Sequence, residues 1–460
     1  MLKKLFAPTD MTKGTPWKSI LMFTLPMLIG NIAQQLYSTV DTIVVGRFAE
    51  NGDNAIAAVG SALPIINMML VLFIGISAGA SVMVSQYFGA RNREGLSYTV
   101  GNCITVTVIA CVFLIAAVAP FLRQILVLLN TPDTIIDGCY DYLMISLIGI
   151  AGMAYYNILS GIIRGLGDSV SALFYLLVAT VLNIGLDILF VAKFRMDVAG
   201  VALATVISQF VSSALCLVKL AKMRDMFDFG WHFMKPVSQY VKTIVKLGLP
   251  SGLTQAIFSS AMIVVQSLTN TFGEMFIAAN VVTMRVDGFA MMPNFSFGTA
   301  LTTYAGQNVG ARDYDRVKKG AKQGTLMAVM CSAVITGIIL IFGKGLMRVF
   351  TETTALVDRS YYLMTILAVG YIAMAVTQSL SGIMRGAGDT MTPMWISLIT
   401  TVIVRVPLAY GIAYFTSPTG VLADGEPTCI QYSLLATWVI GALLTFVFYR
   451  IGKWKGKAIK

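Results

Sequence analysis

The chain has 460 residues, of which 57% are hydrophobic and only 12% are charged. A soluble domain carries charges on about a quarter of its residues to cover its surface. This composition therefore excludes a water-soluble globular protein and indicates a chain that crosses a lipid bilayer many times.

Apolar stretches of about 20 residues, the length that spans a bilayer as a helix, recur along the whole chain. They predict an all-α membrane protein with twelve transmembrane helices. The predicted helices lie near residues 18–46, 54–82, 96–119, 136–160, 170–192, 199–221, 241–269, 276–304, 317–342, 357–382, 392–416 and 429–452.

Cysteine and histidine offer no basis for catalysis or for a transition-metal site. The six cysteines form no CxxC pair, and His232 is the only histidine. The basic N-terminal segment lacks a compact apolar core before a cleavage site, so we expect no removable signal peptide. We therefore expect neither an enzyme nor a bound cofactor.

The basic residues predict the orientation in the membrane. Most of the Lys and Arg residues fall before the first predicted helix, around 219–246, at 312–322 and at the C-terminus. Basic loops stay on the cytoplasmic side, so both termini are expected in the cytoplasm and the chain in the inner membrane. The net charge of +11 then belongs to the membrane surface, and no nucleic-acid partner is expected.

A repeat with a shift of 221 residues divides the chain into two halves. The segment LSGIIRGLGD at 159–168 recurs as LSGIMRGAGD at 380–389, and QYFGAR at 86–91 recurs as QNVGAR at 307–312. Six predicted helices separate the copies, so we expect two pseudo-symmetric six-helix bundles of the same orientation. The predicted domains are an N-terminal half over 1–221, a cytoplasmic linker over 222–240 and a C-terminal half over 241–460.

The repeated RGxGD segments are interpreted as tight cytoplasmic turns. Glycine permits the reversal, and an Arg–Asp pair is expected to clamp it, formed by Arg164 with Asp168 and by Arg385 with Asp389. A phosphate-binding role is disfavoured because the segments lack a Walker lysine and a strand.

These features together resemble the MATE (multidrug and toxic compound extrusion) family of transporters. The resemblance rests on the twelve helices, the two doubled motifs and Met292-Pro293, and it covers almost the whole chain. It implies export of cationic, amphipathic compounds in exchange for H⁺ or Na⁺.

Four polar side chains of the N-terminal half are predicted to meet at one depth in the membrane. Asp41 and Asp187 each lie about five residues, or 7–8 Å of helical rise, from the outer end of their helices. Asn183 shares the face of Asp187, and Thr205 enters at a similar depth. Two carboxylates in a low dielectric favour a bound proton or a bound Na⁺. The alternative is a static hydrogen-bonded network that stabilises helix packing.

The DinF-like branch of the family carries this same set of residues. The resemblance therefore implies that Asp41, Asn183, Asp187 and Thr205 couple transport to a cation and act as Na⁺ ligands if the protein is sodium-coupled. NorM-like members carry further acids in their second half, at positions where this chain has Gln255 and Ala375. Coupling is therefore expected in the N-terminal half.

Further candidates remain open between a functional and a structural role. Asp287, Arg285 and Arg405 lie near mid-membrane, where they either contact substrate or hold the half together through an Asp287–Arg405 ion pair. Pro26 is either a hinge or a tolerated kink. Cavity-lining candidates on the face of Asp41 are Gln34, Tyr37 and Ser38, and Gln255 is a candidate in the second half.

We therefore expect a monomeric antiporter whose two halves rock around a central cavity. Its partners would be the lipid bilayer and an amphipathic small molecule. The main alternative is a lipid-linked-precursor flippase, which would need more cationic side chains in the cavity than Arg285 and Arg405. A channel is not excluded, although the two-half repeat favours alternating access.

Overall fold

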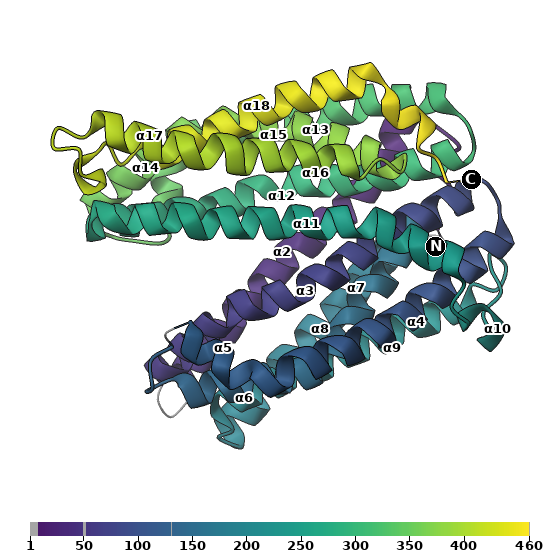
Figure 1. Ribbon diagram of the computed structural model, residues 1–460, viewed down its shortest axis with the longest axis horizontal. Coiled ribbons are helices and arrows are strands. Elements are labelled where there is room, and N and C mark those ends of the chain that lie inside the picture. Colours follow the sequence, from purple (N-terminus) through teal and green to yellow (C-terminus); the bar gives the residue numbers. More distant parts are fainter. Residues whose placement is uncertain (1–7, 49–51, 130, 460) are drawn as a thin grey trace. The chain divides into compact units, whose positions relative to one another are not determined.

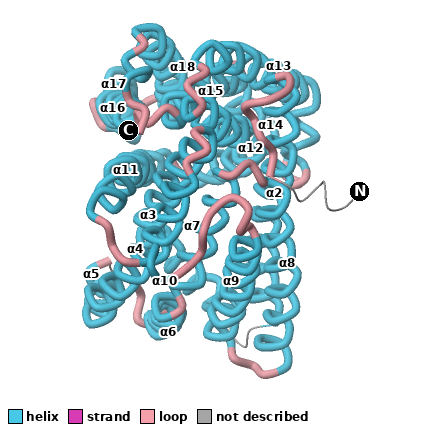
Figure 2. Tube along the Cα trace, turned by 90° about the vertical axis from the view of Figure 1, so that its right-hand side faces the viewer, coloured by secondary structure: helices cyan, strands magenta, loops and turns pink. Residues whose placement is uncertain are grey.

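The computed structural model describes all residues except 1–7, 49–51, 130 and 460. The side chains at 37, 38, 41–43, 45, 46, 52, 53 and 56 also lie outside the described part. Within the described residues the chain is helical and contains no strand (Figures 1 and 2).

The helices follow one another with short connections. The first half contains α2 (Pro16–Phe48), α3 (Gly52–Gly89), α4 (Arg93–Val118), α5 (Leu122–Leu128), α6 (Ile136–Ile148), α7 (Ile150–Gly165), α8 (Ser169–Asp187) and α9 (Asp197–Lys222), and the short α10 (Trp231–Met234) follows. The second half contains α11 (Ser238–Thr269), α12 (Glu274–Gly310), α13 (Tyr314–Arg348), α14 (Thr354–Ala368), α15 (Gly370–Gly386), α16 (Met391–Leu398), α17 (Val406–Thr416) and α18 (Cys429–Ile451). Two π-helical segments, Ile188–Lys193 and Ile399–Arg405, follow α8 and α16.

The twelve predicted spans are confirmed, and two of them are bent. Ten described helical segments are long and apolar enough to cross a membrane, and two bent pairs complete the set of twelve if each pair is one span. The pairs are α6 with α7, bent by 50°, and α14 with α15, bent by 46°. Both breaks occur beside a close packing contact. A Cβ on Gly149 would collide with Val206, and one on Gly370 would collide with Trp438.

The described chain forms two compact units that exchange the beginnings of two helices. Of the described residues, one unit comprises those up to Asp10 together with 29–252, and the other comprises Met11–Leu28 together with those from Leu253 onward. Helices α2 and α11 thus pass from one unit to the other shortly after Pro26 and Pro250. The units therefore differ from the halves expected from the repeat at the beginnings of α2 and α11. The division of the chain into 1–221, 222–240 and 241–460 stays a prediction based on the repeat.

The repeat motif supplies glycines for a close helix crossing inside each unit. In the first unit α7 crosses α3, and in the second α15 crosses α12, with equivalent residues at the contact. Added Cβ atoms would meet the neighbouring helix backbone at each of these glycines, so the helices can approach closely only because the side chains are absent. The paired positions are Gly161 with Ser77, Gly165 with Ser81, Gly382 with Gly298, and Gly386 with Thr302.

The RGxGD turns need their second glycine, as predicted. Gly167 and Gly388 have φ values of +91° and +95°, a region that side chains rarely adopt.

The predicted Arg–Asp clamp is wrong in both copies. Asp168 accepts a hydrogen bond from the Ser171 backbone N–H at 2.8 Å and pairs with Lys219 at 3.1 Å. Arg164 instead donates to the Ser160 hydroxyl at 3.2 Å. The physical reason is helix capping. The aspartate satisfies N–H groups at the start of the helix that follows, while the arginine side chain lies back along the helix that precedes.

The linker at 222–240 is attached to the start of α4 by several hydrogen bonds from Arg93. Arg93 Nε and Nη2 donate to the two carboxylate oxygens of Asp228 at 3.0 and 2.7 Å, and Arg93 also donates to the backbone carbonyl of Asp225 at 3.2 Å. The Tyr98 ring stacks on Tyr240 with centroids 5.2 Å apart. The Arg93 hydrogen bond holds the pKa of the Asp228 carboxyl below its usual range.

Acid should loosen this linker attachment. Because the pKa of Asp228 is lowered in the folded state, the attachment is present above the ordinary carboxyl pKa of about 3.9 and is lost as pH falls through the lowered value. Asp228→Asn should reproduce the loss at neutral pH. Hydrogen exchange of residues 224–234 should then be several-fold faster at pH 7.

Asp225→Asn is the matched control, because Asp225 binds Arg93 through its backbone carbonyl and not through its carboxylate. Equal exchange rates in the two variants would contradict the assignment.

Candidate functional site

Three of the four predicted coupling residues lie in the first unit on neighbouring helices. Asn183 and Asp187 occupy the last turns of α8 and are fully buried, and Thr205 on α9 is 9% exposed. The Asn183 amide Nδ2 is placed to donate to the Thr205 hydroxyl, with 3.5 Å between the two atoms. Placing a carboxylate at full burial beside neutral oxygen groups is costly unless a cation or a proton accompanies it.

The backbone changes its helical winding directly after Asp187. The π-helical segment Ile188–Lys193 follows α8 without a break, and its backbone N–H groups reach back to different carbonyls than in an α-helix. Such π-turns insert an extra residue, reorient neighbouring side chains and are frequent at functional sites. The π-helical segment packs against α9.

The fourth predicted residue, Asp41, lies on α2, and its side chain lies outside the described residues, as do those of Tyr37 and Ser38. The outer part of α2 belongs to the same compact unit as α8 and α9. Gly30 places α2 against α8, since a Cβ there would lie 3.5 Å from the Leu173 side chain. The meeting of the Asp41 and Asp187 carboxylates stays a prediction.

In the second unit, Asp287 is engaged by a tyrosine. The fully buried Tyr371 hydroxyl donates to Asp287 Oδ1 at 2.8 Å, and the Tyr371 ring lies 5.6 Å from the Trp438 ring. The direct Asp287–Arg405 ion pair that the sequence offered as one alternative does not form. Both residues are described, and no Arg405 nitrogen lies within 4.0 Å of an Asp287 oxygen. The two charges still interact electrostatically across the intervening distance.

Arg405 is 7% exposed and ends the second π-helical segment. Among the described residues its buried Nε has no hydrogen-bond partner. The charge of Asp287 interacts with it from a distance and offsets part of the cost of burial.

The remaining candidates are divided between the two units. Gln34 in the first unit and Arg285 and Gln255 in the second are exposed. Pro26 is half-buried inside α2, which continues as a helix through it. Their assignment to substrate contact or hinge motion stays a prediction.

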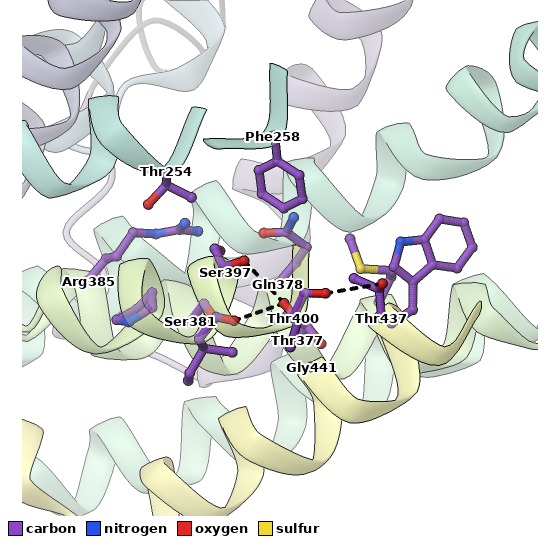
Figure 3. A pocket seen from close by; sticks show the side chains of 14 residues that line it. Thr254, Phe258, Thr377, Gln378, Ser381, Arg385, Ser397, Thr400, Thr437 and Gly441 are labelled. Atoms are coloured by element: carbon purple, nitrogen blue, oxygen red, sulfur yellow. Dashed lines mark hydrogen bonds between the residues drawn. The ribbon is translucent and has the colours of Figure 1, made fainter. Parts of the chain in front are cut away.

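A polar cavity in the second unit was missed by the sequence analysis. It measures about 60 Å³, and its wall includes Arg385, which was expected to clamp a turn (Figure 3). Helical spacing could have revealed it. Ser381 and Arg385 are four residues apart on α15, and Ser397 and Thr400 are three apart, so each pair shares a helix face.

Comparisons with known proteins agree over nearly the whole chain. The family model described as MatE matches residues 26–189 and 250–411. The chain is 28% identical over 459 residues to the "Probable multidrug resistance protein YoeA" of Bacillus subtilis, covering 97% of this chain and 96% of that protein. It is 30% identical over 449 residues to the "Probable multidrug resistance protein YpnP" of Bacillus subtilis, covering 97% of each.

Solved structures show the same fold. One is titled "Outward-facing conformation of a multidrug resistance MATE family transporter of the MOP superfamily" and matches with a TM-score of 0.88 at 24% identity, covering 97% of this chain and 98% of that one. A second is titled "Reverse polarity of binding pocket suggests different function of a MOP superfamily transporter from Pyrococcus furiosus Vc1" and matches with a TM-score of 0.87 at 23% identity, with the same coverage.

Proposed function

The chain belongs to the MatE family of multidrug resistance transporters, and from this premise we propose that it exports hydrophobic, cationic compounds in exchange for H⁺ or Na⁺. Multidrug transport implies small-molecule substrates, and the family is not a class of enzymes. We further propose a monomer in the inner membrane with both termini in the cytoplasm, on the basis of the distribution of Lys and Arg.

The observation that carries the antiport proposal is the buried carboxylate of Asp187, one helical turn beyond the Asn183 amide that reaches Thr205. A carboxylate in a water-poor interior alternates readily between a protonated and a cation-bound state, because each neutralises its charge. Inward movement of the cation down its gradient would supply the free energy for export.

The residues present fit either ion. Na⁺ prefers hard oxygen ligands, and this cluster offers carboxylate, amide and hydroxyl oxygens. When the Asn183 amide N–H points to Thr205, its carbonyl oxygen faces away from the hydroxyl. A proton needs only the carboxylate. The cation here is a transported substrate.

We propose that Pro26 is the hinge that links ion binding to substrate release. Pro26 removes a backbone hydrogen bond from α2, and this helix passes from one unit to the other shortly after it. Asp41 lies fifteen residues further along the same helix, at about 22 Å of helical rise. Neutralising Asp41 would remove a charge near the C-terminal end of α2. Pro26 weakens the same helix nearer its N-terminal end, and we propose that α2 bends there in response.

Export driven by one defined gradient tests the proposal. In proteoliposomes that contain the full chain, a lipophilic cationic dye should move only when a proton or a Na⁺ gradient is imposed. A neutral dye of the same ring structure should move more slowly, because it does not compete for the anionic site. Dye movement that is independent of both gradients would contradict antiport and would favour the channel.

The lipid-linked-precursor flippase remains the second candidate, and one observation favours it. The structure adds Arg385, which lines a cavity, to the cationic side chains that could contact a pyrophosphate, beyond Arg285 and Arg405. A flippase would show no gradient-driven dye export under the same conditions.

A further inference from the structure

Arg385 lines a small, partly open cavity that lies wholly within the second unit. Helices α11, α15, α16 and α18 and the second π-helical segment build the wall (Figure 3). The polar residues of the wall are Arg385, Gln378, two serines and four threonines: Ser381, Ser397, Thr254, Thr377, Thr400 and Thr437. Figure 3 shows the Arg385 side chain extending toward Thr254.

The cavity carries a positive charge that its own wall does not neutralise. No Asp or Glu is among the 14 residues that line it. Within the described part of the chain the Arg385 guanidinium has neither a hydrogen-bond nor an ion-pair partner. Asp389, one turn further along, is occupied by the backbone N–H and the hydroxyl of Thr392, at 3.2 and 2.8 Å. Arg385 is half-buried, and a partly dehydrated guanidinium without a counter-charge is stabilised when an anion pairs with it.

The neutral groups beside Arg385 are hydrogen-bond donors. The hydroxyls of Ser381 and Ser397 have no partner among the described residues, and the Gln378 amide is likewise unengaged there. By contrast, the Thr400 hydroxyl is already bound to the Ile396 carbonyl at 2.8 Å. A planar five-donor guanidinium with hydroxyls at its side matches the geometry of a carboxylate or a phosphate.

The size of the cavity suits a head group and not a whole drug. Its volume of about 60 Å³ exceeds the roughly 10–15 Å³ that a single water needs. It is far below the roughly 300–1,000 Å³ of a drug-sized site. The wall also contains large apolar side chains, among them Phe258, Met374 and Trp438.

The equivalent arginine of the other half is not arranged in this way. Arg164 corresponds to Arg385 in the repeat, and it donates to Ser160 on its own helix. Its half also carries the buried acid Asp187, where the second half has Leu408. The two halves thus share the arginine but differ at the acidic position, where the second half is apolar.

We propose that the cavity around Arg385 is a binding subsite for one oxyanionic group, a phosphate or a carboxylate, at the end of an amphipathic molecule. The apolar wall would contact the adjoining hydrocarbon part of that molecule. The proposal goes beyond cation export and does not depend on it, since it concerns a different unit and the opposite charge.

Binding of defined probes to the purified full chain tests the proposal. Octyl phosphate, inorganic phosphate and octyltrimethylammonium are titrated by calorimetry in lipid nanodiscs. Octyl phosphate should bind, and Arg385→Gln should weaken it by about tenfold or more, the usual effect of removing a charged hydrogen bond. Arg385→Lys should retain part of the affinity, because it keeps the charge but not the fork of donors.

The controls separate a local site from general charge. Arg164→Gln should leave octyl phosphate affinity unchanged, and octyltrimethylammonium binding should not respond to Arg385→Gln. Octyl phosphate should bind more tightly than inorganic phosphate, because only the former has a hydrocarbon part for the apolar wall. Equal affinities would overturn the amphipathic ligand and leave a site for free phosphate.

Unchanged octyl phosphate affinity in Arg385→Gln, or an equal loss in Arg164→Gln, would overturn the proposal. Ser397→Ala provides a second variant should Arg385→Gln fail to give folded protein. It removes one hydroxyl donor and should lower octyl phosphate affinity several-fold, and an unaltered affinity would also overturn the proposal.

Discussion

Asp187→Asn should reduce gradient-driven export to the level of empty liposomes while the protein stays folded in the membrane. The amide keeps the size and most of the hydrogen-bonding capacity of the buried carboxylate, so α8 and α9 should pack as before. It cannot take up or release a proton and carries no charge for Na⁺. Dye efflux measured separately under proton and Na⁺ gradients, with gel filtration as the check on folding, tests this expectation. Asp41→Asn should behave in the same way.

Two further variants locate the coupling site. Asn183→Ala removes a ligand oxygen but no proton site, so Na⁺-driven efflux should fall more than proton-driven efflux. Leu408→Asn places the same amide at the repeat-equivalent position of the other half and should leave both activities intact. Full efflux by Asp187→Asn would move the coupling site elsewhere, with the Tyr371-bound Asp287 as the next candidate.

The helices could be predicted from the sequence because the bilayer imposes one dominant constraint. Each span must be apolar over about 20 residues, and that signal is local. The bends between α6 and α7 and between α14 and α15 could not be predicted in this way. They occur beside Gly149 and Gly370, whose importance depends on Val206 and Trp438, residues that are distant in sequence.

The assignment of the beginnings of α2 and α11 to the opposite unit could not be predicted from the sequence either. The repeat reports which residues are equivalent, and it contains no information on which unit they pack against. Only contacts show that the start of α2 belongs with the second unit, where the Met11 backbone N–H donates to Gln307 at 2.9 Å.

Counting helical rise predicted that Asn183 and Thr205 lie at one depth, and the structure brings them together. Their role in coupling stays a prediction. The Arg–Asp clamp was predicted wrongly because the opposite charges of each RGxGD segment lie four residues apart and were expected to pair with each other. An aspartate just before an apolar helix is also a common N-cap, and that local signal was present in the sequence.

Gly382→Ala should cost the protein most or all of its folded population. A Cβ at this position would collide with the backbone carbonyl oxygen of Gly298, and a backbone atom cannot rotate aside as a side chain can. Helices α12 and α15 would have to separate along their crossing, which forms part of the packing of the second unit. Overpacking of this kind costs about 1–3 kcal/mol and sometimes more. Thermal unfolding in detergent and the yield of monodisperse protein measure the loss.

The rest of the chain offers graded controls for this crossing. Gly337→Ala on α13 meets no atom within 4 Å and should stabilise the helix slightly, by about 0.4–1 kcal/mol, because alanine restricts the unfolded chain. Gly161→Ala at the equivalent crossing faces the Ser77 side chain, whose hydroxyl can give up its 2.7 Å bond to the Asn157 carbonyl and rotate. Its loss should therefore fall between the other two. If Gly382→Ala and Gly337→Ala unfold at the same temperature, the crossing does not require a glycine, and the repeated LSG motif must be explained by something other than close helix packing.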